Sequence, residues 1–157
     1  TAPQNVVKRT EKFERFWFAP LVDKPERGSL TRIMSATTSA PCLNTGGTVG
    51  TAAWVFAHRV LHAANIAAVG MDFGYYADTP LEQTQSWHML GGDQAMYPTF
   101  VNPAGQRFYT DPTYAWYREN FLTLLAENGA QVKNCSGAGL FFGAGVEWVT
   151  LERWLSG

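Results

Sequence analysis

The sequence contains few cysteines, and they do not cluster. Cys42 and Cys135 are the only two among 157 residues, and no CxxC spacing occurs. A disulfide-stabilised scaffold and a zinc knuckle are therefore excluded, and a reduced, cytoplasmic protein is the expectation. For Cys135, at the end of an expected strand, a small buried thiol is favoured over the alternative of a nucleophile.

Neither sign of charge is in excess, and long apolar runs are missing. The formal net charge is −1 and the twelve Lys and Arg are scattered along the chain, so we expect no nucleic-acid partner. No apolar run approaches the roughly 18–20 residues of a membrane span, and the polar start lacks a signal-peptide core. The length predicts a single α/β domain over residues 1–157. Because the sequence begins with Thr1 rather than Met, we expect a piece of a longer protein.

Several catalytic motifs are also absent. No Gly-Lys-Ser/Thr and no G-x-S-x-G occurs, which excludes a Walker A loop and the nucleophile elbow of an α/β-hydrolase. His58 and His62 stand one helical turn apart, which is metal-ligand spacing, but no HExxH motif surrounds them. We therefore expect a solvated helix face there and no protein metal site.

The most informative stretch runs from Asn44 to Tyr76. Its first four residues, NTGG, have the composition of a turn, and Thr45 or Thr48 can cap the helix that follows over 48–64. Apolar residues at helical spacing predict one buried stripe, formed by residues 49, 52, 53, 56, 57, 60, 61 and 64. A glycine loop at a helix N-terminus suits a phosphate; the alternative is a tight turn into a core helix.

A short apolar run over 66–71 follows, as expected of a parallel strand buried on both faces. A second helix is predicted over 112–128, with Asp111 as its N-cap, Pro112 at its first position and Asn128-Gly129 as its C-cap. Its expected buried stripe consists of Tyr114, Tyr117, Phe121, Leu124 and Leu125.

A second strand is predicted over 131–135. The alternation predicts a three-layer Rossmann-like α/β domain with a mainly parallel sheet. In it, the strands 66–71 and 131–135 are adjacent or nearly so, parallel and central, and both helices pack against the sheet.

Ligands of such sheets bind beyond the carboxyl ends of the strands. Asp72 ends the first strand, and we expect it to share a rim with Tyr75, Tyr76 and the Gly46-Gly47 loop. The Ser136-Gly137-Ala138-Gly139 loop should lie on the same edge. For Asp72 the alternatives are a strand-end cap or an ion pair.

The long stretch 77–112 is rich in aromatic residues and predicts a lid or insertion over this edge. Within it, 96–101 is expected to pair with a strand over 106–110. His88, flanked by Trp87 and Met89, is the candidate general acid or base. The alternative for this stretch is a contact between copies in a homo-oligomer.

The remaining segments give weaker patterns. Residues 6–18 fit either a charged helix ending near Pro20 or a strand through 15–18. The expectation for 23–28 is a surface turn, and for 30–41 a connection with at most a short helical turn. A strand over 146–149 and a helix over 151–155 complete the chain.

Three segments together resemble a known family: TGGTVGTAAWVFA, IAAVGMDFGYY and NCSGAGLFFGAGVEWVTLERWL, about half of the chain. They are similar to the 6-hydroxymethylpterin diphosphokinase MptE-like proteins, a family that includes the Maf motility accessory factors and is related to Rossmann-like bacterial sialyltransferases. The Gly-x-Gly-Pro-Ser turn that completes the nucleotide site of that family is absent. Either this piece starts downstream of it or the chain has lost half of the site.

The resemblance implies a nucleotide-dependent transferase, either a diphosphokinase using ATP or a glycosyltransferase using a CMP-activated nonulosonic acid. A non-catalytic nucleotide- or sugar-phosphate-binding module is the alternative. Mg²⁺ bound with the nucleotide would be the cofactor, near Asp72. The candidate catalytic residues are Asp72 and His88, and the candidate nucleotide-binding residues are Asn44, Thr45, Gly46, Gly47, Thr48, Gly70, Tyr75, Ser136 and Gly137.

Overall fold

A computed structural model describes residues 4–15, 17–20, 30–39 and 41–157 of the chain, which divides into two compact units, Thr1–Asn44 and Thr45–Gly157. The predicted turn at 23–28 lies outside the described residues. Among the described residues, no helix is long and apolar enough to cross a membrane.

The described part of the first unit contains two helices and one pair of strands. Helix α1 (Gln4–Arg9) precedes strand β1 (Ala19–Pro20), which pairs in parallel with β2 (Cys42–Leu43). Of the two alternatives for 6–18 the helix forms, although it ends at Arg9. Helix α2 (Leu30–Thr38) shows that the prediction of a connection with at most a short helical turn is wrong. Serine and threonine lower helix propensity only slightly, and the Thr37 hydroxyl donates to the Ile33 carbonyl one turn back, at 2.9 Å.

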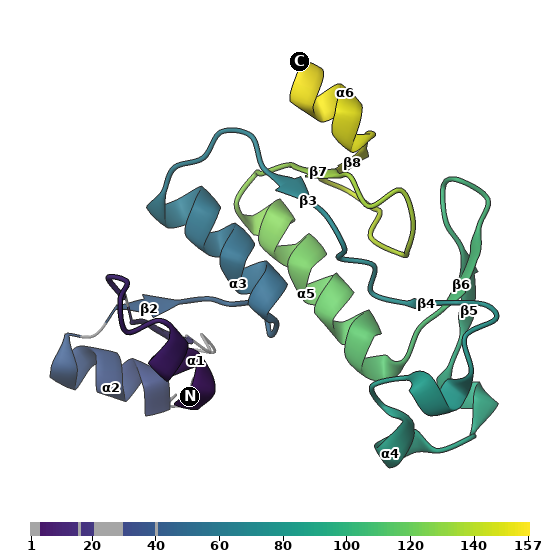
Figure 1. The fold of residues 1–157 in the computed structure, drawn as a ribbon, viewed down its shortest axis with the longest axis horizontal. Coiled ribbons are helices and arrows are strands. Elements are labelled where there is room, and N and C mark those ends of the chain that lie inside the picture. The colour runs from purple at the N-terminus through teal and green to yellow at the C-terminus, as the bar shows by residue number, and fades with distance from the viewer. Residues whose placement is uncertain (1–3, 16, 21–29, 40) are drawn as a thin grey trace. The chain divides into compact units, whose positions relative to one another are not determined.

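The second unit is organised around two helices that lie side by side in Figure 1, α3 (Val49–Val55) and α5 (Pro112–Glu127). Their contact includes the rings of Trp54 and Phe121, whose centroids are 5.4 Å apart. Phe121 also stacks on Phe141 at 4.9 Å, and both phenylalanines are fully buried. The core of this unit therefore lies between the two helices and the segment that carries Phe141.

Both helix starts form as predicted. Thr48 caps α3, since its hydroxyl accepts a hydrogen bond from the Thr51 N–H at 3.0 Å in a capping box. Asp111 caps α5 by accepting from the Tyr114 N–H at 2.8 Å, Pro112 occupies the first position, and Gly129 follows the C-cap with φ +56°.

The predicted buried stripe of the first helix is wrong. The buried side chains are those of Thr51, Trp54 and Val55, whereas Val49 is 87% and Leu61 63% exposed. The bulky Trp54 ring sets the face that packs on α5. Beyond α3 the helix continues as a π-helical turn over Phe56–Val60 and ends there rather than at 64. A π-helical turn has more residues than an α-helical one, so it shifts the faces that a 3.6-residue spacing assigns.

A small parallel sheet has the order β3 (Ala67–Ala68), β7 (Val132–Asn134), β8 (Val146–Trp148). The prediction that 66–71 and 131–135 contain adjacent parallel strands is confirmed, with Ala67 opposite Lys133. Among the described strands of this sheet only β7 is central, and β3 is at the edge. The predicted terminal strand and helix also form, as β8 and α6 (Leu151–Ser156).

The part of the chain between β3 and β7 forms an antiparallel sheet with the order β4 (Tyr75–Tyr76), β6 (Arg107–Tyr109), β5 (Thr99–Val101). The β5–β6 pairing confirms the predicted hairpin. Between β4 and β5 lie three short helices: a 3₁₀ turn at Leu81–Gln83, α4 (Trp87–Leu90) and a 3₁₀ turn at Gln94–Met96. Tyr97, Phe108 and Tyr109 are buried, so part of the stretch predicted as a lid belongs to the core.

The prediction of a three-layer Rossmann-like domain with a mainly parallel sheet is therefore wrong. The described strands are two or three residues long and form one antiparallel sheet and two short parallel ones. The reason lies after Asp72, where the chain enters the antiparallel strand β4 within three residues instead of crossing back through a helix. A parallel sheet needs such crossovers to extend.

Candidate functional site

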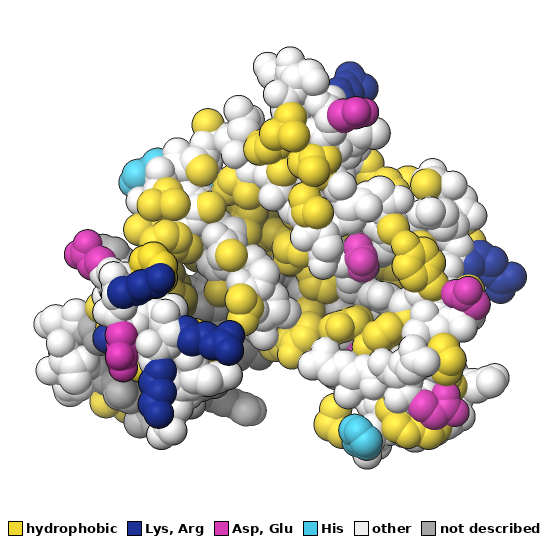
Figure 2. Space-filling model, viewed as in Figure 1, with side chains coloured by type: hydrophobic (Ala, Val, Ile, Leu, Met, Phe, Trp, Pro, Cys, Tyr) yellow, Lys and Arg dark blue, Asp and Glu magenta, His cyan; other side chains and the backbone are white. Residues whose placement is uncertain are grey.

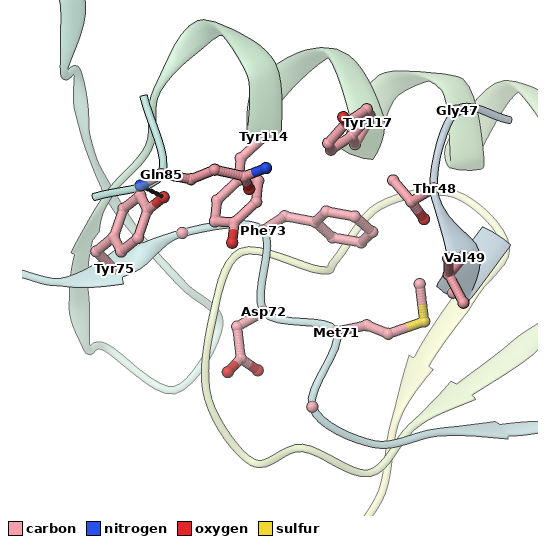
Figure 3. Close-up of a pocket in the computed structure, with 13 residues that line it drawn as sticks. Gly47, Thr48, Val49, Met71, Asp72, Phe73, Tyr75, Gln85, Tyr114 and Tyr117 are labelled. Carbon is pink, nitrogen blue, oxygen red and sulfur yellow. Dashed lines mark hydrogen bonds between the residues drawn. The ribbon is translucent and has the colours of Figure 1, made fainter. Parts of the chain in front are cut away.

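A cavity of about 690 Å³ opens in the second unit where the start of α3, the segment after β3 and the first turns of α5 meet (Figure 3). In Figure 3, Thr48 and Val49 lie on one side, Tyr75 and Gln85 lie on the other, and Phe73 lies between them. The lining consists of Gly47, Thr48, Val49, Gly50, Gly70, Met71, Asp72, Phe73, Gly74, Tyr75, Gln85, Tyr114 and Tyr117. Of the rim predicted to join the Gly46-Gly47 loop with Asp72, Tyr75 and Tyr76, the cavity brings together Gly47, Asp72 and Tyr75.

The floor of the cavity is the segment 70–74, which the loop between β7 and β8 holds in place. The Gly70 N–H donates to the Ser136 hydroxyl at 2.9 Å, and the Leu140 N–H donates to the Asp72 carbonyl at 2.6 Å. Gly139 packs so closely that an added Cβ would lie 2.6 Å from the Asp72 Cα. The backbone that carries the Asp72 carboxyl is therefore fixed before any ligand arrives.

Phe73 adopts a backbone conformation that is unusual for an aromatic residue, with φ +52°. Left-handed backbone is costly for bulky side chains and persists only where the surroundings enforce it. Here the Thr110 hydroxyl donates to the Phe73 carbonyl at 2.9 Å, and the buried ring packs edge-on against Phe141 at 5.3 Å. Strain of this kind concentrates at functional sites, and Phe73 forms part of the cavity wall.

Asp72 is the acidic group of the cavity, and one of its carboxyl oxygens is unsatisfied. Its Oδ1 is buried and has no hydrogen-bond partner among the described residues. Burial raises the pKa of the Asp72 carboxyl above its usual value, and the neighbouring Ser136 side chain opposes that rise. A buried acceptor without a partner is costly, so a donor group that reached this oxygen would be bound favourably there.

The opposite wall is built from tyrosines. The Tyr75 hydroxyl donates to Asp111 Oδ2 at 3.2 Å and accepts from the Gln85 N–H at 2.9 Å. Its ring stacks on Tyr114 with centroids 5.1 Å apart. Burial raises the pKa of Tyr75 well above its ordinary value, so its hydroxyl stays neutral at physiological pH. The residue that caps α5 thus also orients an aromatic wall of the cavity.

The glycines of the 44–47 loop have a structural explanation. Gly46 (φ +61°) would place a Cβ 2.7 Å from Leu124, and Gly47 (φ +96°) would place one 2.5 Å from the ring of Trp116. Both therefore allow the loop to approach α5. Of the two, only Gly47 lines the cavity, and no Lys, Arg or His does among the described residues. A ligand phosphate would meet no positively charged side chain here.

The other predicted residues do not line the cavity. Thr45, Gly46 and Gly137 lie outside its lining, as do Tyr76 and His88, and Asn44 ends the other unit. His88 is exposed on the short helix α4. Ser136 is also outside the lining, but it acts on the site through Asp72 and Gly70.

Sequence reasoning missed the walls of the cavity: Met71, Phe73, Gln85 and two residues of α5, Tyr114 and Tyr117. The two tyrosines were assigned to the buried stripe of α5, whose half-buried start they occupy. Their hydroxyl groups were the available signal, because a buried tyrosine hydroxyl needs a hydrogen-bond partner, which an apolar core does not supply.

The other groups considered from sequence stand apart from the cavity. His58 stacks on Trp54 at 4.9 Å, and no three His, Cys, Asp or Glu residues in the described part of the chain come together as a metal site. Cys135 is buried, and burial raises the pKa of its thiol, which disfavours the reactive thiolate.

Comparison of the chain with protein-family models, with curated proteins and with solved structures found no match in any of the three.

Proposed function

We propose that this cavity binds the base and sugar rings of a nucleoside or nucleotide-sugar ligand, and that the chain acts as a nucleotide-binding module. The observation that carries the proposal is the unsatisfied Oδ1 of Asp72 in the lining of a cavity with aromatic walls. A carboxylate accepts hydrogen bonds from base N–H groups or sugar hydroxyls, and flat rings stack on tyrosine and phenylalanine.

The charge of the lining indicates which part of the ligand is recognised. Among the described residues that line the cavity, Asp72 carries the one ionisable carboxyl, and no cationic side chain accompanies it. A phosphate would be repelled by this carboxylate, whereas a neutral ring would not. The base and ribose therefore supply the recognition, and phosphates extend toward solvent.

Ligand-dependent thermal stabilisation tests the proposal, with cytidine, CMP, adenosine, ATP and a CMP-activated sugar compared at equal concentration. At least one nucleoside should raise the Tm nearly as much as its nucleotide. Asp72→Asn should abolish most of that rise, while Asp78→Asn, in an exposed loop, serves as the matched control. The proposal fails if no compound at millimolar concentration raises the Tm, or if both variants respond as the unmodified protein does.

A nucleotide-dependent transferase of the MptE-like kind is the second candidate, favoured by one observation: the raised pKa of Asp72. A carboxylate with a raised pKa is a better general base. An acceptor hydroxyl would give its proton to Asp72 as its oxygen forms a bond to the transferred group and the nucleotide leaves. This candidate rests on the site alone, because the fold expected from the resemblance does not form.

Mg²⁺ fits only in part. The lining offers one carboxylate and no second acidic side chain, so a metal ion would be held chiefly by ligand phosphates. Binding without turnover of ATP or a CMP-activated sugar, with and without Mg²⁺, would favour the module over the transferase. We place either activity in the cytoplasm, where nucleotides are abundant and cysteines that form no disulfide are usual.

A further inference from the structure

Strand β5 is an exposed edge of the antiparallel sheet. It pairs with β6 on one side, and among the described residues no strand pairs with its other side. Phe100 is 46% and Val101 59% exposed, and Figure 2 shows hydrophobic side chains reaching the surface over this sheet. Natural proteins usually protect such an edge with charge or a bulge. Thr99, Phe100 and Val101 carry no charge.

The hydrogen bonds of the hairpin show which backbone groups face outward. The Thr110 N–H donates to the Pro98 carbonyl at 3.1 Å, and the Asn102 N–H donates to the Gln106 carbonyl at 3.0 Å. Bonded and non-bonded pairs alternate along an antiparallel ladder. Phe100, between these two bonded positions, therefore directs its N–H and C=O toward β6.

The residues on either side of Phe100 have the opposite orientation. Thr99 and Val101 direct their N–H and C=O groups to the open edge, and neither forms a backbone hydrogen bond there with any described residue. The outward-facing groups are thus placed symmetrically about Phe100.

We infer that β5 pairs with β5 of a second copy of this chain, antiparallel and about a twofold axis through Phe100. In this register Thr99 lies opposite Val101 of the second copy, and each such pair exchanges two hydrogen bonds through groups that already point outward. Phe100 lies opposite Phe100 of the second copy in a non-hydrogen-bonded pair, where cross-strand side chains approach most closely. The edge is therefore complementary to itself.

A second observation favours an aromatic side chain from the other copy over an unrelated strand. Beside Phe100 is a largely apolar cavity of about 290 Å³, whose walls include Pro98, Leu140 and Phe142. Arg118 braces two of these walls, because its guanidinium donates to the Leu140 carbonyl at 2.7 Å and also to the Phe142 carbonyl. In the twofold register, the Phe100 ring of the second copy lies over this face and covers the cavity. Each copy covers the cavity of the other.

Disulfide formation at the axis tests the register. In a Cys42→Ser background, Phe100→Cys should form a disulfide-linked dimer with oxidised glutathione, because facing residues of a non-hydrogen-bonded pair are about 4.5 Å apart between Cα atoms. Val101→Cys is the matched control: it faces Thr99, and its counterpart lies diagonally at about 7–8 Å, beyond the usual disulfide span. Phe100→Cys should give at least about tenfold more dimer. Equal amounts from both variants, or none from Phe100→Cys, would overturn the register.

Sedimentation of the full chain at increasing concentration tests the native contact without new cysteines. Val101→Pro removes an outward N–H while leaving the bonds to β6 intact, and Val101→Ala keeps that N–H. We expect a monomer–dimer equilibrium whose Kd rises by about tenfold or more with proline and much less with alanine. A chain that stays monomeric at millimolar concentration, or equal behaviour of both variants, would refute the dimer. These outcomes leave the proposed ligand site untouched, since β5 does not line that cavity.

Discussion

Replacing Gly47 by alanine should destabilise the fold for two reasons: backbone strain at a positive φ, and overlap of the new Cβ with the Trp116 ring. The residue has φ +96°, and a Cβ there would lie 2.5 Å from Trp116 Cζ3 and 2.9 Å from Cη2. Backbone strain of a non-glycine residue at positive φ costs about 1–3 kcal/mol. The overlap with Trp116 adds to this, unless the ring, which is 56% exposed, moves away.

Gly137 provides the matched control because it also has a positive φ, +69°, but an added Cβ would meet nothing within 4 Å. Gly137→Ala should therefore show the strain alone. We expect Gly47→Ala to lower the free energy of unfolding by about 1 kcal/mol more than Gly137→Ala, which corresponds to about 2–4 °C in Tm for a chain of this size.

A double-mutant cycle with Trp116→Ala completes the measurement. Once the indole ring is removed, Gly47→Ala should cost no more than Gly137→Ala. Urea unfolding followed by circular dichroism gives the four free energies. If Gly47→Ala and Gly137→Ala cost the same in the unmodified background, or if removing Trp116 does not reduce the cost at Gly47, the packing explanation of this glycine is wrong.

Three further predictions concern the core, a helix cap and the buried acid. Phe121→Ala removes a fully buried ring that contacts Trp54 and Phe141, and should cost about 3–5 kcal/mol in chemical denaturation. Asp111→Ala should cost at least about 1–2 kcal/mol, because it removes the cap and also the acceptor of the Tyr75 hydroxyl, whereas Asp111→Asn keeps a capping oxygen and should recover the share of the cap; equal losses would contradict the cap. The pKa of Asp72 is raised in the folded state, so the unfolded chain loses this proton first and stability falls as pH rises from the unfolded value of 3.8 through the folded pKa. Asp72→Asn should therefore raise the Tm at pH 7, and the difference in Tm between the variant and the unmodified protein should shrink below about pH 4. A difference in Tm that grows in acid would show that the pKa of Asp72 is lowered by folding rather than raised.

Part of the candidate site follows from local sequence. The turn chemistry at 44–47, the cap at Thr48 and the Gly-x-Asp at the end of the apolar run identify Gly47, Thr48, Gly70 and Asp72, all of which line the cavity. These signals are readable because each depends on residues within one or two turns of backbone. The prediction of His88 lacked such support: its neighbours Trp87 and Met89 suggested a lid, yet α4 lies outside the cavity lining.

The sequence alone determined where the helices α3 and α5 begin, where α5 ends, and that β3 and β7 pair in parallel. Only the tertiary structure decided which face of α3 is buried and how the chain continues after Asp72. It also decided that Tyr114 and Tyr117 face a cavity rather than the core. Caps and turns are fixed by hydrogen bonds between residues close in the chain, whereas the burial of a side chain depends on which distant segment packs against it. Here the Trp54 ring against Phe121, and the pairing of β4 with β6, outweighed the periodicity of the local sequence.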